Sequence, residues 1–189
     1  MNQIFLSASI PEPGRGDFFE TADPFLIQFA VRELLTVCLG RRRIVWGGHP
    51  AITPMVWAVC EDLGVKYAKS VSLFQSRFFK DLFPVENARF KNVTYVPAAV
   101  DKNSSLLQMR KAMLKGRFEA AVFIGGMEGV LDEHALFRDL HPKTKTLPIA
   151  TPGGAAATLP NRFPGDVDRI DFARLFAERL NIDSQEPRR

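Results

Sequence analysis

Cysteine is scarce in this chain, and the features of a secreted or membrane-spanning protein are missing. Of 189 residues only Cys38 and Cys60 are cysteines, and both lie in apolar stretches of helical character. Such surroundings predict buried free thiols rather than a disulfide framework. Asp17 and Glu20 interrupt the region where a signal peptide needs an apolar core. No run of about 18 apolar residues occurs. We therefore expect a cytoplasmic protein with no membrane span.

An excess of charge of one sign is also nearly absent. The chain has 25 Lys and Arg against 21 Asp and Glu, a net charge of +4. The runs Arg41–Arg43 and Arg188–Arg189 supply five of the positive charges, and without them the balance is −1. Long duplex nucleic acid needs a broadly basic face, so it is a poor candidate partner. Arg41–Arg43 comes before a predicted strand, which favours a solvated turn or a partner patch far from the predicted cleft.

The remaining composition is that of an ordinary globular protein. Hydrophobic residues make up 46% and charged residues 24%, which excludes disordered and fibrous classes. No repeat, low-complexity segment or internal linker is found. The length predicts one domain, which we place at residues 1–183, followed by a tail at 184–189. We expect the chain after Asn181 to be frayed.

Strand and helix patterns alternate along the chain. Strands are predicted at 4–8, 43–46, 71–74, 93–96, 120–124 and 147–150. Helices are predicted between Asp23 and Gly40, between Thr53 and Gly64, from an Asn103 or Ser104 cap to Leu114, and at 128–140, 155–160 and 168–180. One or two short helices are expected within 76–90. Phe25, Phe29, Leu34 and Leu35 are expected on the core side of the first helix. This alternation predicts an α/β fold with a parallel sheet covered on both faces.

Glycine turns follow several predicted strands, at 47–50, 125–129 and 151–154. In open α/β sheets, ligands bind beyond the carboxyl ends of the strands. A glycine turn that leads into a helix directs backbone N–H groups at an anion, and phosphate is the natural candidate. None of the turns has the Walker lysine or the full G-x-G-x-x-G pattern, which disfavours a P-loop kinase or an NAD dehydrogenase.

Three segments together point to a family. Residues 45–55 (VWGGHPAITPM) form a glycine loop and the start of a helix. Residues 109–113 (MRKAM) precede an apolar strand, and 125–133 (GGMEGVLDE) follow it. In order and spacing, over about residues 4–150, the chain resembles the SLOG superfamily, which is named after DNA-processing proteins and the Lonely Guy cytokinin-activating enzymes.

The resemblance implies a Rossmann-like, three-layer αβα fold with a mostly parallel sheet. It implies binding of a small-molecule nucleotide or nucleotide derivative, as a sensor in a bacterial defence or signalling system. The alternative is a phosphoribohydrolase that cleaves the N-glycosidic bond of a nucleoside 5′-monophosphate. A third and weaker hypothesis is a nonenzymatic DNA-associated module. No cofactor is implied.

Relatives of this kind form dimers with sites near the interface, so the resemblance also implies a homodimer. The residues expected to build core and dimer surface are Phe74, Phe78, Phe79, Phe83 and Phe90. A metal site is not expected, because His134 and His141 lack metal-ligand spacing with any Cys or carboxylate pair.

Arg110 and Glu133 align with the arginine and the catalytic glutamate of the enzymes. A guanidinium can grip phosphate or ribose oxygens, and a carboxylate near the ribose can stabilise an oxocarbenium-like transition state or activate water. The structural alternatives are a solvated helix face and a glutamate favoured by the helix dipole. Val130 replaces the signature threonine, Ile124 replaces its leading proline, and Met127 or Glu128 is an extra residue. These departures fall on the phosphate cradle and leave catalysis open.

A larger set of residues is predicted to contact the ligand. Glu128 could bind a ribose hydroxyl or face solvent, and Asp132 is equally open as a helix-start acid. The predicted ligand-binding residues are Ser7, Ser9, Gly47, Gly48, His49, Lys111, Gly125, Gly126, Met127, Glu128, Gly129 and Val130.

Overall fold

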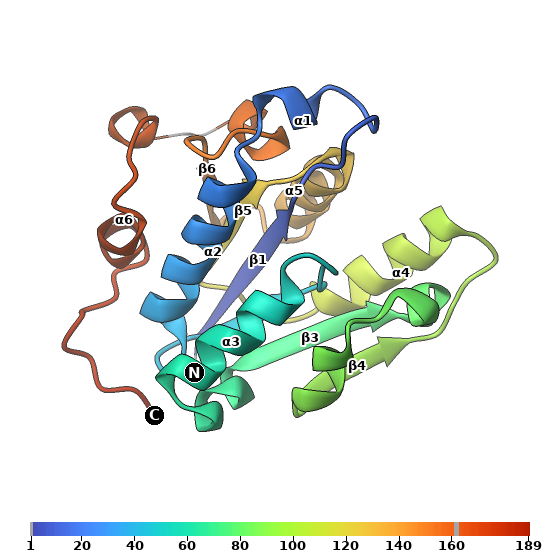
Figure 1. The fold of residues 1–189 in the computed structure, drawn as a ribbon, viewed down its shortest axis with the longest axis horizontal. Helices are drawn as coiled ribbons and strands as arrows, with labels where there is room; N and C mark the ends of the chain where they lie inside the picture. The colour runs from blue at the N-terminus through green and yellow to red at the C-terminus, as the bar shows by residue number, and fades with distance from the viewer. Residues whose placement is uncertain (1, 161–162) are drawn as a thin grey trace.

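A six-stranded sheet forms the centre of the protein, in the order β4-β3-β2-β1-β5-β6, and every pair is parallel (Figure 1). The computed structural model describes residues 2–160 and 163–189. The strands are β1 (Gln3–Ser9), β2 (Arg43–Trp46), β3 (Val71–Ser76), β4 (Asn92–Val96), β5 (Ala120–Gly125) and β6 (Lys145–Ile149). The predicted α/β class is confirmed, with a sheet that is entirely rather than mostly parallel.

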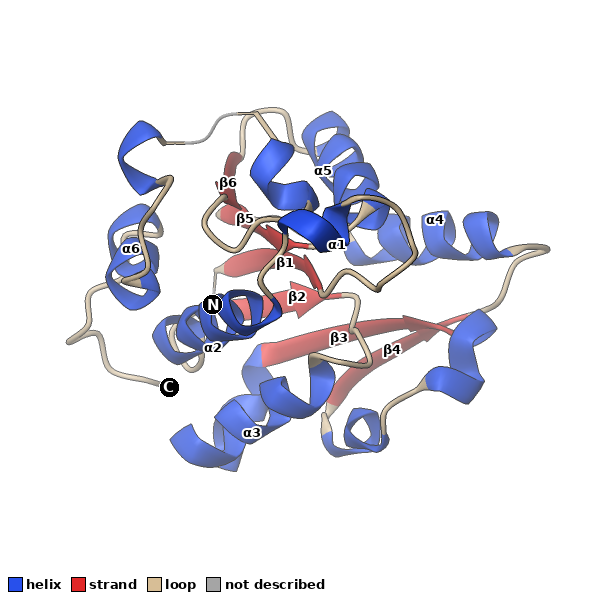
Figure 2. Ribbon diagram, turned by 45° about the horizontal axis from the view of Figure 1, so that its top comes forward, coloured by secondary structure: helices blue, strands red, loops and turns tan. Residues whose placement is uncertain are grey.

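Helices cover both faces of the sheet, which gives the expected three layers (Figure 2). On one face lie α2 (Pro24–Cys38), α3 (Thr53–Leu63) and α6 (Phe172–Arg179). On the other face lie α4 (Lys102–Met113) and α5 (Glu128–Leu140), while α1 (Phe18–Thr21) is a single turn. Within residues 2–160 and 163–189 there are also five 3-10 turns: η1 (Val65–Ser70), η2 (Arg77–Leu82), η3 (Val85–Arg89), η4 (Ala155–Thr158) and η5 (Pro164–Asp166).

The core forms because each central strand is apolar on both sides. In β1, Ile4 and Leu6 face α2 and α3, whereas Phe5 between them faces α5. Phe5 stacks on Phe137 with ring centroids 5.6 Å apart. Each fully buried side chain of this size contributes about 1.5–3 kcal/mol to folding. The packed sheet holds the carboxyl ends of its strands rigidly in place, and the loops that follow them build the site.

The start of α2 follows the predicted cap. Asp23 accepts hydrogen bonds from the amides of Phe25 at 2.9 Å and Leu26 at 3.0 Å, and Pro24 occupies the first turn. The expected core side is wrong for the two phenylalanines, because Phe25 is 75% exposed and Phe29 is 36% exposed. The buried stripe instead follows Ile27, Ala30, Val31, Leu34, Leu35 and Cys38.

Two other helix starts differ from the prediction because a neighbouring aspartate makes the cap. Asp101 accepts from the Ser104 amide at 2.8 Å, so α4 begins at Lys102, ahead of the expected Asn103 or Ser104 cap. Asp171 accepts from the Arg174 amide at 3.2 Å. Helix α6 therefore begins at Phe172 rather than at 168, and the preceding residues form η5 and a turn.

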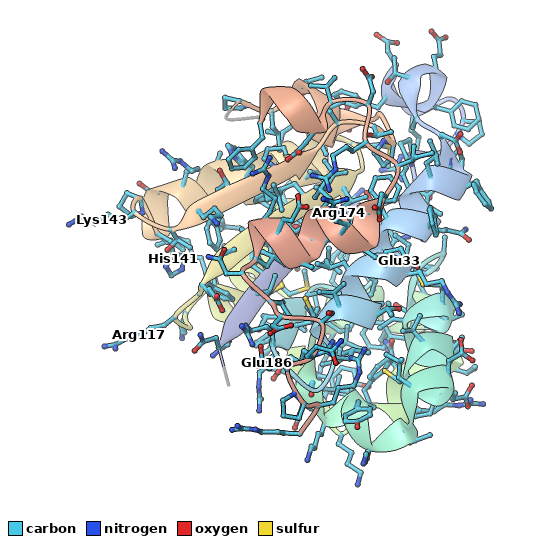
Figure 3. All side chains as sticks on the ribbon, turned by 90° about the vertical axis from the view of Figure 1, so that its left-hand side faces the viewer. Glu33, Arg117, His141, Lys143, Arg174 and Glu186 are labelled. Atoms are coloured by element: carbon cyan, nitrogen blue, oxygen red, sulfur yellow. The ribbon has the colours of Figure 1, made fainter. Side chains whose placement is uncertain are left out.

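The tail is not frayed, and the arginine run does not form a solvated turn. Arg41 donates to the backbone carbonyls of Ser184 at 2.8 Å and Glu186 at 2.6 Å. Arg42 pairs with the Glu186 carboxylate at 2.9 Å. Arg188 donates to the carbonyls of Thr36 and Leu39 at the end of α2. Figure 3, which labels Glu186, shows the tail passing beside α2. The two arginine-rich segments therefore hold the tail against α2.

Both cysteines are buried and free, as predicted. Burial raises the pKa of the Cys38 thiol and of the Cys60 thiol to about 12, so both stay protonated at neutral pH. Within the described residues, no helix is long and apolar enough to cross a bilayer.

Candidate functional site

A cavity of about 430 Å³ lies at the carboxyl ends of β1, β2 and β3, beside the starts of α4 and α5. Its location is the one expected for ligand sites in open parallel sheets. One part of its wall is the glycine loop 47–50, and another is the first turn of α5. The remaining wall comes from the loop after β1, the end of β3, η2 and the exposed face of α4.

The structure brings part of the predicted site to this cavity. The predicted residues that line it are Ser9, Gly47, Gly48, His49, Arg110, Met127, Glu128 and Gly129. Those that do not line it are Ser7, Lys111, Gly125, Gly126, Val130 and Glu133. The two residues aligned with the enzymes' catalytic pair are therefore divided, with Arg110 on the wall and Glu133 behind it.

Arg110 is held by three acceptors of α5. Its guanidinium contacts the carboxylates of Asp132 at 3.0 Å and Glu133 at 3.3 Å, and the carbonyl of Gly129 at 3.2 Å. The Arg110 side chain is only 11% exposed. Because Arg110 belongs to α4 and its three acceptors belong to α5, these bonds join the two helices, which lie next to each other on one face of the sheet. Three of the five N–H donors of Arg110 are engaged in these bonds, and its charge is offset by two carboxylates before any ligand binds.

Glu133 is enclosed between Arg110 and β1. The Ser7 hydroxyl donates to its second oxygen at 2.6 Å, and its side chain is 16% exposed. Burial raises the pKa of Glu133 above its usual value, while Arg110 and the Ser7 hydrogen bond act in the opposite direction. Ser7, predicted as a ligand contact, here positions a carboxyl group instead.

The first glycine turn is shaped by a neighbour that the sequence analysis missed. Gly48 has φ of +71°, and a Cβ there would overlap the side-chain amide of Gln75. Gln75 lines the cavity at the end of β3 and donates to the carbonyl of Gly47. The available signal was a polar residue that directly follows the strand predicted at 71–74.

The last glycine turn serves packing rather than the cavity. Gly153 has φ of +73°, and a Cβ there would overlap the carbonyl oxygen of Thr21. A Cβ on Gly154 would lie 2.9 Å from the carbonyl carbon of Gly125. These glycines let three backbone segments approach closely, and neither lines the cavity. Of the three glycine turns expected at the ligand, two reach it.

The second of these turns leads into α5. Met127 is the N-cap and makes no side-chain capping bond, so the first turn of the helix presents its amide groups beside the cavity. Glu128 and Gly129 of this turn line the cavity. The Gly126 amide already donates a hydrogen bond to the carbonyl of Ser9 at 2.8 Å and so does not point at a ligand. The helix start favours an anionic group, and the Glu128 carboxylate opposes one.

Charges around the cavity balance. Its charged lining consists of the acids Glu12, Glu128 and Asp132 and the bases Arg15, Lys102 and Arg110. His49 is an uncharged donor, because burial lowers its pKa and its Nδ1 accepts from the Ala51 amide at 3.3 Å. That bond leaves Nε2 to carry the ring proton. The charged groups of the lining therefore sum to about zero, and the cavity offers a ligand both cationic donors and carboxylate acceptors.

One wall of the cavity is apolar, and most of it was missed. Phe79 was predicted as core or dimer surface, and here it lines the cavity together with Leu82, Pro84, Leu106 and Met109. The signal was the aromatic-rich segment at 76–90, whose role depends on how η2 folds over the end of β3. An apolar wall facing a polar wall fits a ligand with a flat apolar part and a polar part.

Comparisons with known proteins agree with this architecture. The profile of the SLOG cluster3 family matches residues 17–180. Comparison with curated proteins gives no match. Among solved structures, the chain is similar to the X-ray structure of TM1055, a target of the Northeast Structural Genomics Consortium, with a TM-score of 0.50. Sequence identity to it is 13%, and the alignment covers 82% of this chain and 78% of that chain. Such a likeness shows the fold alone, and the Rossmann-like prediction is confirmed. Because the family profile spans most of its length, the chain belongs to the SLOG cluster3 family.

Proposed function

We propose that this protein binds a nucleotide or nucleotide derivative in the cavity and acts as a sensor of it. Family membership supports this, and so does a cavity at the carboxyl ends of the strands. The observation that carries the choice of sensor over enzyme is the position of Glu133. Its carboxyl group is bonded to Ser7 and Arg110 and does not line the cavity. A bound ribose would therefore not meet the carboxylate that hydrolysis needs.

The two walls assign the parts of such a ligand. We place the base against the apolar wall at Phe79 and Leu82, where an aromatic ring and aliphatic side chains can cover its faces. We place ribose and phosphate between the glycine loop at Gly48 and the first turn of α5. Lys102, at the start of α4, lies where it can pair with a phosphate and offset the cavity's acids.

A phosphoribohydrolase remains the second candidate because Arg110 and Glu133 are in contact at 3.3 Å. For that reaction the Glu133 carboxyl must leave Ser7 and reach the ribose. There the protonated carboxyl would donate its proton to the departing base, and the resulting carboxylate would activate water.

We also propose that the protein is a homodimer. Two large apolar side chains on segments that border the cavity are exposed, Leu82 at 65% and Val85 at 77%. Exposed apolar groups gathered on one flank are typical of an interaction surface. Light scattering should give twice the chain mass, and Leu82→Glu together with Val85→Glu should give the monomer mass. A light-scattering mass of one chain for the wild type at about 0.5 mM would contradict this proposal.

Calorimetry with AMP, ADP-ribose, NAD and cyclic nucleotides tests the binding proposal. Lys102→Ala should weaken binding of the best ligand by about tenfold, because it removes one charge-assisted contact. Lys111→Ala is the matched control, since Lys111 lies on the same helix but does not line the cavity. Absence of binding at about 1 mM for every compound would overturn the proposal.

Incubation with AMP, GMP and CMP separates the two candidates. A sensor releases no free base. Release that disappears in Glu133→Ala would establish the hydrolase instead. Retarded migration of single-stranded DNA at low salt, without nucleotide binding, would favour the DNA-associated module.

A further inference from the structure

A groove separate from the cavity lies at the amino ends of the strands, whereas the cavity lies at their carboxyl ends. It has a volume of about 550 Å³ and is built from the amino ends of β1 to β4 and the last turn of α4. Gln3, Arg43 and Asn92, which begin three of these strands, line it. No residue lines both hollows. The groove therefore has no part in the function proposed above.

The floor of the groove is a part of the sheet that α4 leaves uncovered. Register pairs Val45 with Ser72, and Phe74 with Thr94, so these side chains face the same side. Helix α4 ends at Met113, and the chain turns away at Gly116. Phe74 is consequently only partly buried, although β3 is paired on both sides, with β2 and β4. An aromatic side chain on a covered face of a parallel sheet is normally shielded, so the gap above Phe74 can accept an occupant.

Positive charge surrounds this floor without any compensation. Arg43, Lys91 and Lys115 line the groove, and its lining contains no Asp or Glu. Over residues 2–160 and 163–189, none of the three forms an ion pair within 4.0 Å. The adjacent Arg42, by contrast, is paired with two glutamates, at 2.9 and 3.1 Å. The three cations thus form an unneutralised set around a floor that carries polar Ser72 and Thr94 beside Phe74, and this set is complementary to an acidic partner.

The outermost strand of the sheet, β4, lies next to the groove. Strand β4 is the last in the sheet order and pairs with β3 alone within the described residues. It lies on the flank of the molecule away from α6 (Figure 1). Lys91 to Thr94 form one wall of the groove. The same segment therefore borders the basic groove and also carries backbone N–H and C=O groups that no further strand pairs within the described residues. An extended peptide can pair with such an edge while alternate side chains point into the groove.

We propose that this basic groove binds an acidic, extended segment of a partner protein alongside β4. Carboxylates at alternate positions of the segment would point into the groove, where Lys91 directly precedes β4 and where Arg43 and Lys115 add to the positive charge. Nucleic acid fits less well, because three cations neutralise few phosphates and the rest of the chain is nearly neutral.

Fluorescence anisotropy with a labelled peptide of about eight residues, alternating Glu and Thr, tests the proposal on the full chain. The peptide should bind in a salt-dependent manner, and the Gln–Thr analogue should not bind. Lys91→Glu combined with Lys115→Glu should weaken binding at least about tenfold. The matched control is Lys66→Glu combined with Lys143→Glu, which makes the same charge change at exposed sites outside the groove. It should alter binding by less than about twofold.

Three results would overturn the proposal. The first is no saturable binding up to about 1 mM peptide at low salt. The second is an equal loss in the two double variants, which would reveal a response to net charge only. The third is tighter binding of an oligothymidylate of equal charge through the same lysines, which would make the groove a nucleic-acid surface. All four lysines are exposed, so both double variants should retain the wild-type unfolding transition.

Discussion

Replacing Arg110 by Met would expose how strongly Glu133 depends on its partner. Methionine keeps most of the aliphatic stem but removes the guanidinium that contacts Glu133 at 3.3 Å, Asp132 at 3.0 Å and the Gly129 carbonyl at 3.2 Å. The Asp132 contact contributes little, because that side chain is 64% exposed. The Glu133 contact contributes most, because its side chain is 16% exposed. Breaking a buried pair by removing one partner costs about 3–5 kcal/mol, and the remaining Ser7 bond places Arg110→Met near the lower limit.

The loss of folding stability in Arg110→Met should depend on pH, and the pKa of Glu133 sets the direction of that dependence. Its pKa in the folded protein is already raised by burial above the usual 4.5, and removal of Arg110 raises it further. The folded state then holds a proton that the unfolded state releases, so stability falls as pH rises from about 4.5 through the folded-state pKa. We expect a loss in Arg110→Met of about 3 kcal/mol at pH near 8, and a smaller loss at pH near 5, because a larger share of the Glu133 carboxyl then carries a proton.

Urea unfolding of the wild type and variants at the two pH values measures this difference. Adding Glu133→Gln to Arg110→Met removes the buried charge and should recover about 2 kcal/mol at the higher pH. Arg32→Met is the control, because its pair with Asp62 is half exposed and should contribute less than about 1 kcal/mol. Equal losses at both pH values, or no recovery in the double variant, would refute the reasoning.

Three further changes test other parts of the structure. Gly153→Ala should destabilise the protein by more than about 2 kcal/mol in thermal or urea unfolding, because its Cβ would overlap the backbone of α1 and its φ is +73°. Gly14→Ala shares the positive φ without any neighbour within 4 Å and should cost only about 1 kcal/mol, so equal losses would contradict the packing role. Asp166→Asn should cost about 2 kcal/mol near pH 7, since Arg179 holds the Asp166 carboxylate at 2.7 and 3.0 Å. Arg179 lowers the pKa of Asp166, so its contribution is present above about pH 3.8 and should disappear as pH falls below it. Arg188→Ala should increase hydrogen exchange at the end of α2 and cost about 1–2 kcal/mol, because two helix carbonyls lose their donor; unchanged exchange there would show that the tail contributes nothing.

Local chemistry made much of the fold predictable. Apolar runs between glycine turns located all six strands, because buried parallel strands are apolar on both sides. The Asp23–Pro24 pair fixed the start of α2 because both residues act within one turn. Failures occurred where tertiary contacts decide. Phe25 is apolar yet exposed, and the end of the chain is ordered by arginines that contact carbonyls about 150 residues away.

The candidate site was predictable only in part. Strand ends and glycine turns indicated the right edge of the sheet, where Gly48 and Arg110 line the cavity. Which face of each helix points inward depends on how α4 and α5 pack, so the sequence could not place Glu133 behind Arg110. Gln75 and Phe79 reach the cavity through the local path of β3 and η2, which no motif records. Their ligand roles stay predictions.

The pairing of β1 has a consequence for how quickly the protein can fold. Its two neighbours are β2 and β5, and the Ser7–Glu133 hydrogen bond closes a separation of 126 residues along the chain. Ribosomes add roughly 5–20 residues per second, so β1 waits on the order of ten seconds for its second partner during synthesis. Non-local pairing of this kind slows the search for the native state as well. The contact of Glu133 with Ser7 and Arg110 therefore cannot form before β5 and α5 have been made, and one side of the apolar strand β1 remains unpaired until then.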